Sequence, residues 1–400
     1  NADIIDYGTY QDGNINLASP SANGSHVVGY IVFKEGTQQV DLRIGSSFIS
    51  YEQASYNLEK EIPTTASFED TKEKVKDSWN HYLSKVQLEG ASKDELQIYY
   101  TALFHTLQFP RETSEHGKYF SAFDSKIHEG VSYNDYSLWD TFRAEHPWLQ
   151  LIAPERVNDM IQSLVQMYQE GGWLPKWPNP TYSNIMIGTH ADAVIADAYI
   201  NGFRGYDVKT AYEAIRKNAY TPPAQDEAFR WKDRAPWNGH YEARGGLTNY
   251  LKQGYVSEEK ANESVSRTLE FALDDYCIAQ MAKALGHKQD YKDLMKRAKN
   301  YVNLYNPETG FFQARNLDGS WCDDEKGMTE GAKWTYQFCV MQDVDGLIKL
   351  MGGRESFLKK LDQNFDEKHY RHDNEPGHHY VYLYNYCNEL AKTQQRIPEI

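Results

Sequence analysis

Two glutamates, Glu330 and Glu375, stand in the segments best suited to acid/base chemistry. Glu330 opens the stretch over residues 330–337, and Glu375 comes directly before Pro376 and Gly377. Each position predicts a helix entrance, where the positive end of the helix dipole can hold a carboxylate, a metal ligand or a sugar oxygen. Acid/base chemistry on a polar substrate needs a carboxyl group fixed in a partly dry cleft, and both segments look built for that purpose.

Glu330, Trp334 and Gln337 fall at i, i+4 and i+7, so a continuous helix would place them on one stripe. A carboxyl group against Trp334 would lose solvation, which disfavours its charged form, raises its pKa and suits a general acid. The alternative is a surface glutamate that caps the helix, and these residues alone favour neither interpretation.

Asn374 and Glu375 supply two neighbouring hard oxygen donors just before Pro376, a favoured first-turn residue. Oxygen donors without cysteine favour calcium, and two protein ligands leave room for water and substrate hydroxyls. His378 and His379 follow closely. Adjacent positions on a helix diverge by about 100°, so we expect these histidines to donate hydrogen bonds to a sugar instead of forming a zinc pair.

A third candidate segment, residues 137–143, opens a helix that carries Trp139, Asp140 and Arg143 within about one turn. Asp140 and Arg143 stand at i, i+3, so they can pair with each other or together grip vicinal sugar hydroxyls. On these residues alone, a salt bridge at the helix start beside a core tryptophan is favoured.

An aromatic loop over residues 171–178 places Trp173 and Trp177 on either side of a proline. This composition does not suit a regular helix, so the loop is either packed or a stacking platform for a ligand. His190, two residues before Asp192, can act as a ligand, although a hydrogen-bonded structural histidine is the more common case. Each of these signals is weak by itself.

The composition is that of a globular protein with a real core, because 40% of the 400 residues are hydrophobic and 25% are charged. The aromatic content is 14%, with 30 Tyr and 9 Trp. Many rings must therefore have one wet edge, as in a sugar-binding cleft, unless tyrosine simply replaces Leu and Phe in the core. The net charge of −15 argues against nucleic acid or an anionic membrane as partner.

Four cysteines without C-x-x-C spacing argue against a zinc site, and a core of this size does not require disulfides. The chain has no run of about 18 apolar residues, which argues against a membrane span. Its first residues, Asn-Ala-Asp-Ile-Ile, do not form a signal peptide. We expect any export signal to have been removed or to lie outside this chain.

The first part of the chain predicts β structure. Residues 27–33 are rich in β-branched side chains, residues 40–44 alternate apolar and polar, and residues 45–51 are a further extended candidate. So few strands cannot form an independent sheet with both edges protected. We therefore expect residues 1–62 to be the C-terminal part of a larger β-sandwich domain.

The rest of the chain predicts helices. Residues 66–87 carry apolar side chains at helical spacing among many charges, which indicates a helical linker within residues 63–92. We expect residues 93–400 to form a toroid of helical hairpins with no fixed sequence repeat, with no strands beyond brief turns such as residues 309–312. The clearest helical faces lie at residues 96–104, 157–167, 193–200, 211–215, 268–279 and 380–390.

Together these segments resemble glycoside hydrolase family 92, the calcium-dependent, inverting exo-α-mannosidases. The resemblance runs from about Ile44 to Tyr386. It is specific because many blocks occur in the family's order, at residues 47–54, 137–147, 172–177, 186–202, 268–286, 330–338, 343–348 and 374–386. It implies an N-terminal β-sandwich, a helical linker and an (α/α)6 toroid, in the order that the composition predicts.

The resemblance also implies roles for the candidate residues. Glu330 is expected to be the general acid, Asn374 and Glu375 to belong to the site for Ca2+ and sugar, and Asp140 and Arg143 to contact the terminal mannose. The further candidates for substrate contact are Trp139, Trp173, His190, Trp334, His378 and His379.

The chain departs from the family pattern at four points. It ends at Ile400, before the Gly- and Asp-rich segment that carries the family's general base, and it lacks most of the N-terminal sandwich. Either the chain is part of a longer polypeptide, extended at both ends, or it is a protein with half a catalytic pair, and we expect the former. Gln342 replaces a common histidine, and Asn374-Glu375 replaces the His-Glu pair that tends to mark α-1,2-linkage enzymes. The linkage specificity thus stays open.

The function expected from the resemblance is release of terminal mannose from mannose-rich glycans, by single displacement with Ca2+ assistance, in the periplasm or outside the cell. Two other classes stay open. An inactive mannose-binding protein would keep Asp140, Arg143 and Glu375 but show no turnover. A helical scaffold for protein partners would bind no sugar and would pack its loop tryptophans inside.

Overall fold

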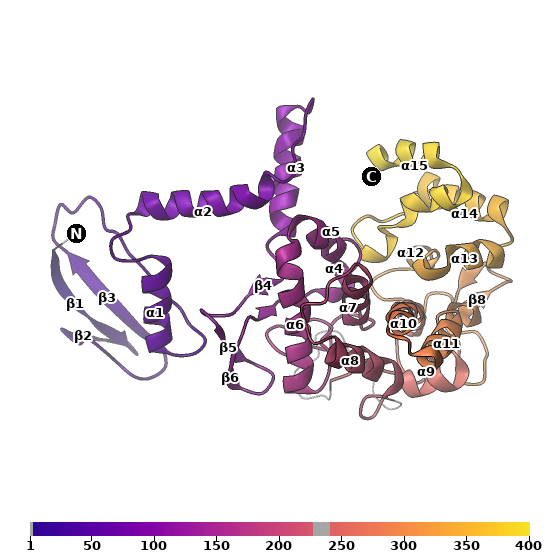
Figure 1. Cartoon of the computed structure of the whole chain (residues 1–400), viewed down its shortest axis with the longest axis horizontal. Helices are drawn as coiled ribbons and strands as arrows, with labels where there is room; N and C mark the ends of the chain where they lie inside the picture. Colours follow the sequence, from indigo (N-terminus) through magenta and orange to yellow (C-terminus); the bar gives the residue numbers. More distant parts are fainter. Residues whose placement is uncertain (1–2, 227–240) are drawn as a thin grey trace. The chain divides into compact units, whose positions relative to one another are not determined.

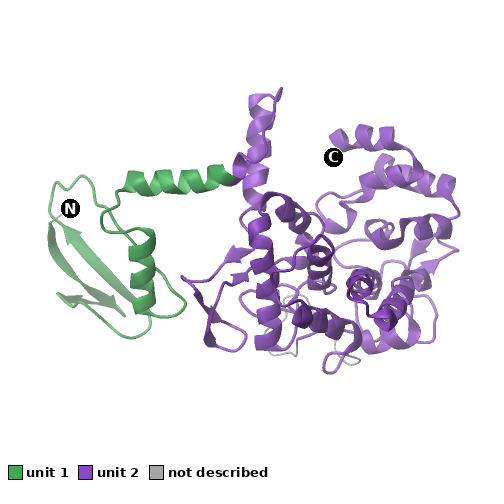
Figure 2. Cartoon of the chain, viewed as in Figure 1, with its two compact units in different colours: residues 1–81 green, residues 82–400 purple. Residues whose placement is uncertain are grey.

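The computed structural model describes residues 3–226 and 241–400. The chain forms two compact units, residues 1–81 and residues 82–400, which are coloured separately in Figure 2. The division falls inside the segment expected to be the linker.

The first unit contains a three-stranded antiparallel sheet in the order β2-β1-β3. Gly8 of the central strand pairs with Leu17 on one side and Tyr30 on the other. Asp12-Gly13 joins β1 to β2 with positive φ at both residues, the backbone that an Asp-Gly hairpin turn favours. The three strands are β1 (Ile4–Gln11), β2 (Asn14–Leu17) and β3 (Val27–Phe33), and β3 confirms the strand expected at residues 27–33.

The other two strands expected in this unit are wrong. Residues 40–44 and 45–50 form no strand, and helix α1 (Tyr51–Glu61) begins where the second was expected to end. The reason is a local cap: the Ser50 hydroxyl accepts a hydrogen bond from the backbone N–H of Gln53 (3.1 Å). The helix expected within residues 66–87 is confirmed as α2 (Phe68–Leu83).

The second unit is mainly α-helical, and α6 (Pro154–Gly171) shows how its sequence specifies a helix (Figure 1). Pro154 occupies the first turn, where a missing N–H costs nothing, and Gly172 ends the helix with a left-handed φ of 88°. The expected face is confirmed, because the following residues are buried: Val157, Met160, Ile161, Leu164 and Met167.

The longer helices of this unit are α3 (Lys93–Thr106), α5 (Glu145–Ile152), α7 (Ala191–Ile200), α8 (Val208–Tyr220), α9 (Leu247–Gln253), α10 (Ser264–Leu285), α11 (Lys288–Arg297), α13 (Val344–Leu350), α14 (Arg354–Asp366) and α15 (Leu390–Arg396). Single turns form α4 (Leu138–Thr141) and α12 (Lys333–Tyr336). Among the described residues, no helix combines the length and the apolar character that crossing a membrane requires.

Helix α10 is the central helix of this unit, and Figure 1 shows it nearly end-on between neighbouring helices. It contacts α7, α8 and α11. Its Ile278 and Met281 join one hydrophobic core with α6, α7 and α8, while Val265 and Leu269 join a second core with α13 and α14. A helix buried on all sides normally carries apolar residues throughout. Helix α10 departs from this rule, because Arg267, Glu270, Asp274 and Asp275 are charged and buried.

Two details of the expected helical domain are wrong. Short antiparallel pairs occur outside the expected turn, namely β4 (Arg111–Glu112) with β7 (Tyr133–Asn134) and β5 (Lys118–Ser121) with β6 (Lys126–Glu129). The turn expected at residues 309–312 belongs to a third pair, β8 (Tyr305–Asn306) with β9 (Phe311–Phe312). The helix expected over residues 380–390 is a 3-10 helix, η4 (Tyr380–Cys387). Its tyrosines are held by outside partners, as the Tyr384 hydroxyl donates to Asp362 (2.9 Å), so tertiary contacts override the α-helical spacing.

Candidate active site

Four of the expected substrate-binding residues, Asp140, Arg143, His378 and His379, line one cavity of about 970 Å³. Helix α4 supplies Asp140, and the turn between η3 (Glu375–Gly377) and η4 supplies the two histidines. The carboxyl group of Asp140 lies within hydrogen-bond reach of Glu375, so two segments far apart in sequence meet here. The wall also includes apolar side chains, among them Tyr99, Trp148, Leu151 and Tyr382.

The carboxyl groups of this cavity titrate near neutrality. The pKa of Asp140 is raised to about 6, mainly by burial. A hydrogen bond from Ser137 opposes this rise, and the charge of Glu375 adds to it. Burial also raises the pKa of Glu145 to about 7, and the charge of Asp140 adds to this effect. The Glu145 Oε1 atom is buried with no hydrogen-bond partner among the described residues. Glu145 was not predicted from the sequence, since nothing in its local pattern distinguishes it from an ordinary first-turn glutamate.

Asn374 connects this cavity to the segment of Glu330. Its Nδ2 atom donates a hydrogen bond to the backbone carbonyl of Glu330 (2.7 Å). Glu330, Trp334 and Asn374 line a second cavity of about 500 Å³, whose wall also carries His369 and Arg371. Asn374 therefore contacts the segment of the expected acid, Glu330, and the neighbouring Glu375 contacts Asp140. These two contacts bring together the expected acid, the two expected metal ligands and Asp140.

The stripe predicted for Glu330, Trp334 and Gln337 is wrong. Helix α12 begins only at Lys333, and Glu330 precedes it with a left-handed φ of 50° and an exposed side chain. The indole of Trp334 instead stacks on the ring of His369, with centroids 4.3 Å apart and planes at 9°. Gln337 is fully buried. The predicted placement of Glu330 and Trp334 on one helix face is therefore wrong, and the role of Glu330 as the acid stays a prediction.

The pair expected between Asp140 and Arg143 does not form in the described chain. Helix α4 ends at Thr141, so Arg143 lies beyond its last turn. The Arg143 Nη2 atom donates to Glu270 Oε1 (2.7 Å), and its Nε atom donates to the carbonyl of Trp139 (3.0 Å). The Trp139 indole N–H also donates to Glu270 Oε1 (3.0 Å). Trp139 is only 3% exposed, which agrees with the interpretation of this residue as a core tryptophan.

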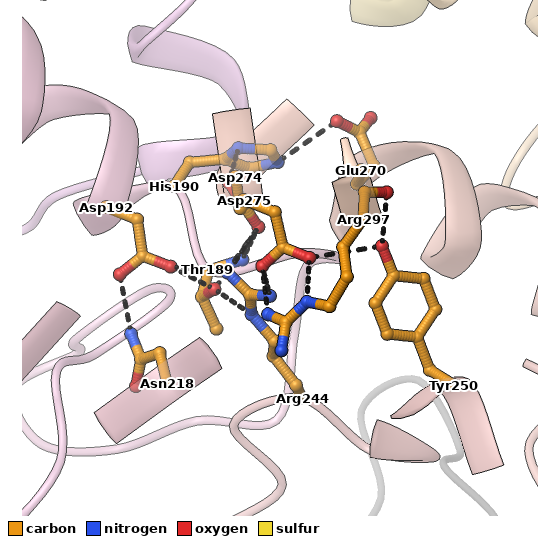
Figure 3. A network of polar contacts seen from close by, with 10 residues as sticks. All are labelled: Thr189, His190, Asp192, Asn218, Arg244, Tyr250, Glu270, Asp274, Asp275 and Arg297. Atoms are coloured by element: carbon orange, nitrogen blue, oxygen red, sulfur yellow. Dashed lines mark hydrogen bonds and ion pairs between the residues drawn. The ribbon is translucent and has the colours of Figure 1, made fainter. Parts of the chain in front are cut away.

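His190 is buried beneath this site. Its Nε2 atom lies 3.2 Å from Glu270 Oε2 and its Nδ1 atom 2.9 Å from Asp274 Oδ1, and Figure 3 shows the arrangement. Burial alone would lower the pKa of His190, but the charges of Asp274 and Glu270 raise it to about 9. Gly188 makes room for the ring, because a Cβ there would lie 2.5 Å from His190 Nε2. His190 is thus an imidazolium held between two carboxylates.

The same network continues along α10, as Figure 3 shows. Asp274 accepts a hydrogen bond from the backbone N–H of Thr189 (2.8 Å). Arg244 pairs with Asp192 (2.9 Å) and with Asp275 (2.6 Å), and Arg297 pairs with Asp275 (2.5 Å). None of this network was predicted from the sequence. The one available signal was the set of carboxylates at residues 270, 274 and 275 within a helix that also carries many apolar residues.

Trp173 lies in a loop, as expected, and is held there by contacts with Tyr182 and Lys217. The Tyr182 hydroxyl accepts a hydrogen bond from the backbone N–H of Trp173 (2.9 Å) and donates to its carbonyl (2.7 Å). The Lys217 Nζ atom lies 4.2 Å from the centroid of the indole ring. In the described part of the chain, Trp139, Trp173 and His190 line neither cavity.

The oxygen atoms around Asn374 could supply some, but not all, of the ligands that a hard cation needs. The Asn374 Oδ1 atom is buried and has no hydrogen-bond partner within residues 3–226 and 241–400. The carboxylates of Glu375 and Asp140 lie next to each other close by, and oxygen-only donors are typical of calcium. The same residues contain no cluster of three or more His, Cys, Asp or Glu side chains arranged for a metal ion. The chain thus offers an incomplete oxygen set.

Carboxyl groups gathered around a cavity suit the hydrolysis of a glycosidic bond, because most glycoside hydrolases use a pair of Asp or Glu residues. Residues 53–400 match the glycosyl hydrolase family 92 catalytic domain, and the chain belongs to this family. The fold agrees, because the catalytic domain of its structural relatives is an (α/α)6 toroid. This confirms the mainly α, toroid-type fold, preceded by strands and a helical segment, that the sequence predicts.

Two solved relatives come from Bacteroides thetaiotaomicron. A family GH92 inverting mannosidase is 31% identical with a TM-score of 0.83, over 96% of this chain and 55% of that chain. A GH92 alpha-mannosidase is 30% identical with a TM-score of 0.81, over 98% and 53%, and it has also been solved in complex with mannoimidazole. An uncharacterized secreted glycosidase of Arthroderma benhamiae is 26% identical over 90% of this chain and 46% of its own length. The chain thus spans about half the length of these relatives.

Proposed function

We propose that the protein to which this chain belongs is an exo-acting α-mannosidase that releases terminal mannose from mannose-rich glycans by single displacement. The observation that carries the proposal is the junction at Asn374-Glu375. Asn374 binds the segment of Glu330, and Glu375 faces Asp140, so the candidate acid and the candidate sugar contacts share one place. Membership of family 92 and the mannoimidazole complex of a relative support the choice of mannose.

In this proposal Glu330 protonates the leaving oxygen as the glycosidic bond breaks. Asp140 and Arg143 bind hydroxyls of the terminal mannose from the larger cavity. His379 serves as a neutral ligand, because burial lowers its pKa to about 4, and its Nε2 atom lies 2.9 Å from the carbonyl oxygen of Phe338. His378 lines the same cavity and offers a further hydrogen bond.

Asn374 and Glu375 would hold a calcium ion, together with oxygens from water and from the sugar. When bound, such an ion supplies positive charge and orientation to a vicinal diol, without redox chemistry. Single displacement also needs a carboxylate that activates water on the opposite face of the sugar, with roughly 6.5–9.5 Å between the two carboxyl groups. By resemblance, this role falls to an aspartate in a Gly- and Asp-rich segment of the family. The name of the Arthroderma relative supports a periplasmic or secreted location.

The test uses the full-length protein in calcium-containing buffer. Incubation with a mannose-rich glycan should release mannose one residue at a time, and proton NMR at early times should show the β-anomer, the product of inversion. Initial release of the α-anomer, or of larger fragments, would contradict the proposed mechanism. No release together with tight binding of mannoimidazole would indicate a mannose-binding protein, and neither release nor binding would indicate a scaffold.

A further inference from the structure

Arg143 is held in an orientation that leaves one nitrogen free. Its side chain is only 3% exposed, yet it contributes to the wall of the larger cavity. The Nε atom donates to the carbonyl of Trp139 and the Nη2 atom to Glu270. The Nη1 atom is buried and lacks a hydrogen-bond partner among the residues that the structure describes. Because a buried donor without a hydrogen-bond partner is unfavourable, a ligand oxygen is the natural partner for Nη1.

Glu270 fixes that orientation from below the cavity. One of its oxygens, Oε1, accepts hydrogen bonds from both Arg143 and the indole of Trp139. The other, Oε2, faces His190 at 3.2 Å. Glu270 is 3% exposed and is not part of the cavity wall. Glu270 can therefore influence a bound ligand only through the residues that it holds.

The charges along this network alternate in sign. From the cavity inward they are the cation of Arg143, the anion of Glu270, the cation of His190, the anion of Asp274 and the cation of Arg244. Burial alone would raise the pKa of Glu270, but the charges of Arg143 and His190 lower it to about 2. A buried charge without a partner is very costly, so each member of the series is kept in place by its neighbours.

We propose that Glu270 is a positioning residue of the sugar site, which orients the guanidinium of Arg143 so that Nη1 meets a hydroxyl of the ligand. His190, backed by Asp274, holds Glu270 in turn. His190 thus contributes to sugar binding without touching the sugar. The inference rests on the proposed function only in naming the ligand oxygen as a sugar hydroxyl.

The first test is a double-mutant cycle on the full-length protein with mannoimidazole as the probe, read by calorimetry. Glu270→Gln should weaken binding about tenfold, because the amide cannot hold both Arg143 and His190 as the carboxylate does. In an Arg143→Met background the same change should alter the Kd less than twofold. An equal loss in both backgrounds would show that Glu270 does not act through Arg143 and would overturn the proposal.

Asp275→Asn is the matched control, because Asp275 is a buried carboxylate of the same helix that also binds two cations. Its effect on the Kd should be small and should add to that of Arg143→Met. A loss as large as that of Glu270→Gln would point to general destabilisation instead. If Glu270→Gln does not fold, Glu270→Asp keeps the charge one methylene further from Arg143, and the same cycle applies to it.

A crystal structure of the folded Glu270 variant separates this inference from the proposed function. The Arg143 guanidinium should leave the position in which Nε meets the carbonyl of Trp139. An unchanged guanidinium would overturn the positioning role whatever the protein binds. If the unaltered protein binds no mannoimidazole, the proposed function is wrong, and the crystal structure still decides the role of Glu270.

Discussion

The side-chain amide of Asn374 donates a hydrogen bond to the backbone carbonyl of Glu330, 2.7 Å away. This contact ties together two loop segments that neither share a helix nor lie close in sequence. Glu330 has a left-handed φ, and the hydrogen bond gives that exposed turn a fixed partner. Among the described residues, the oxygen of the same amide has no hydrogen-bond partner, so Asn374 can hold the segment of Glu330 and offer an oxygen to a cation at once.

These two roles of Asn374 can be separated by mutation. Asn374→Asp keeps an oxygen at the position but removes the N–H donor, so it should retain calcium binding while kcat falls about tenfold, the equivalent of one lost hydrogen bond. Asn374→Ala removes both groups and should weaken calcium binding as well. Steady-state kinetics and calcium titration of the full-length protein would check this. Equal calcium affinity in Asn374→Ala and the unaltered protein would remove Asn374 from the metal site.

The helices that follow a repeated apolar pattern were predictable because that pattern is local. In α6, apolar residues recur at helical spacing between a proline start and a glycine end, and burial follows the pattern. In the segment of Glu330 the same spacing was misleading. The helix begins only at Lys333, because Ala332 is extended and Glu330 has a left-handed φ. Glu330, at position i, therefore lies outside the helix that carries Trp334, at i+4.

Of the candidate site, only those residues could be predicted whose neighbours in the sequence form an unusual pattern. Asn374-Glu375 before a proline and the group around Asp140 are of this kind. Glu145 and Glu270 are not, because their significance comes from burial and from partners distant in sequence: Glu270 meets Arg143, Trp139 and His190 only after the helices have packed. Without that packing, a carboxylate within a helix is indistinguishable from a solvated one.

Calcium removal is the second prediction. Since the oxygen donors of Asn374 and Glu375 form an incomplete set, the bound ion should exchange readily, and excess chelator should abolish mannose release by the full-length protein. Added calcium should restore the activity, whereas zinc, which prefers nitrogen and sulfur donors, should not. The measurement is mannose release before and after chelation and readdition. Activity that persists in excess chelator would exclude the metal from the mechanism.

The third prediction concerns stability at alkaline pH. The folded state raises the pKa of His190 from 6.5 to about 9, so protonation stabilises the fold fully below pH 6.5, and this contribution is lost as the pH rises through 9. Deprotonation leaves Glu270 and Asp274 facing a neutral ring. The loss should be on the order of 3 kcal/mol. Urea unfolding between pH 7 and 9.5 would measure it, and His190→Gln, which cannot titrate, should show a much flatter profile. Parallel profiles for the two proteins would contradict the assignment.

The last prediction tests Glu330 as the acid by varying the leaving group. A carboxylic acid that protonates the departing oxygen matters most when that oxygen leaves poorly, as from a second mannose, and least when it leaves as an activated aryl oxide. Glu330→Gln in the full-length protein should therefore lower kcat/KM by a factor of about a thousand or more on a mannobiose, but by less than about tenfold on a dinitrophenyl mannoside. Asn374→Asp is a useful comparison, because it disturbs the position of the acid without removing it. Equal losses on both substrates would show that Glu330 binds substrate or supports the loop, and the acid would then have to be sought among the other carboxyl groups near the two cavities, with Glu145 first.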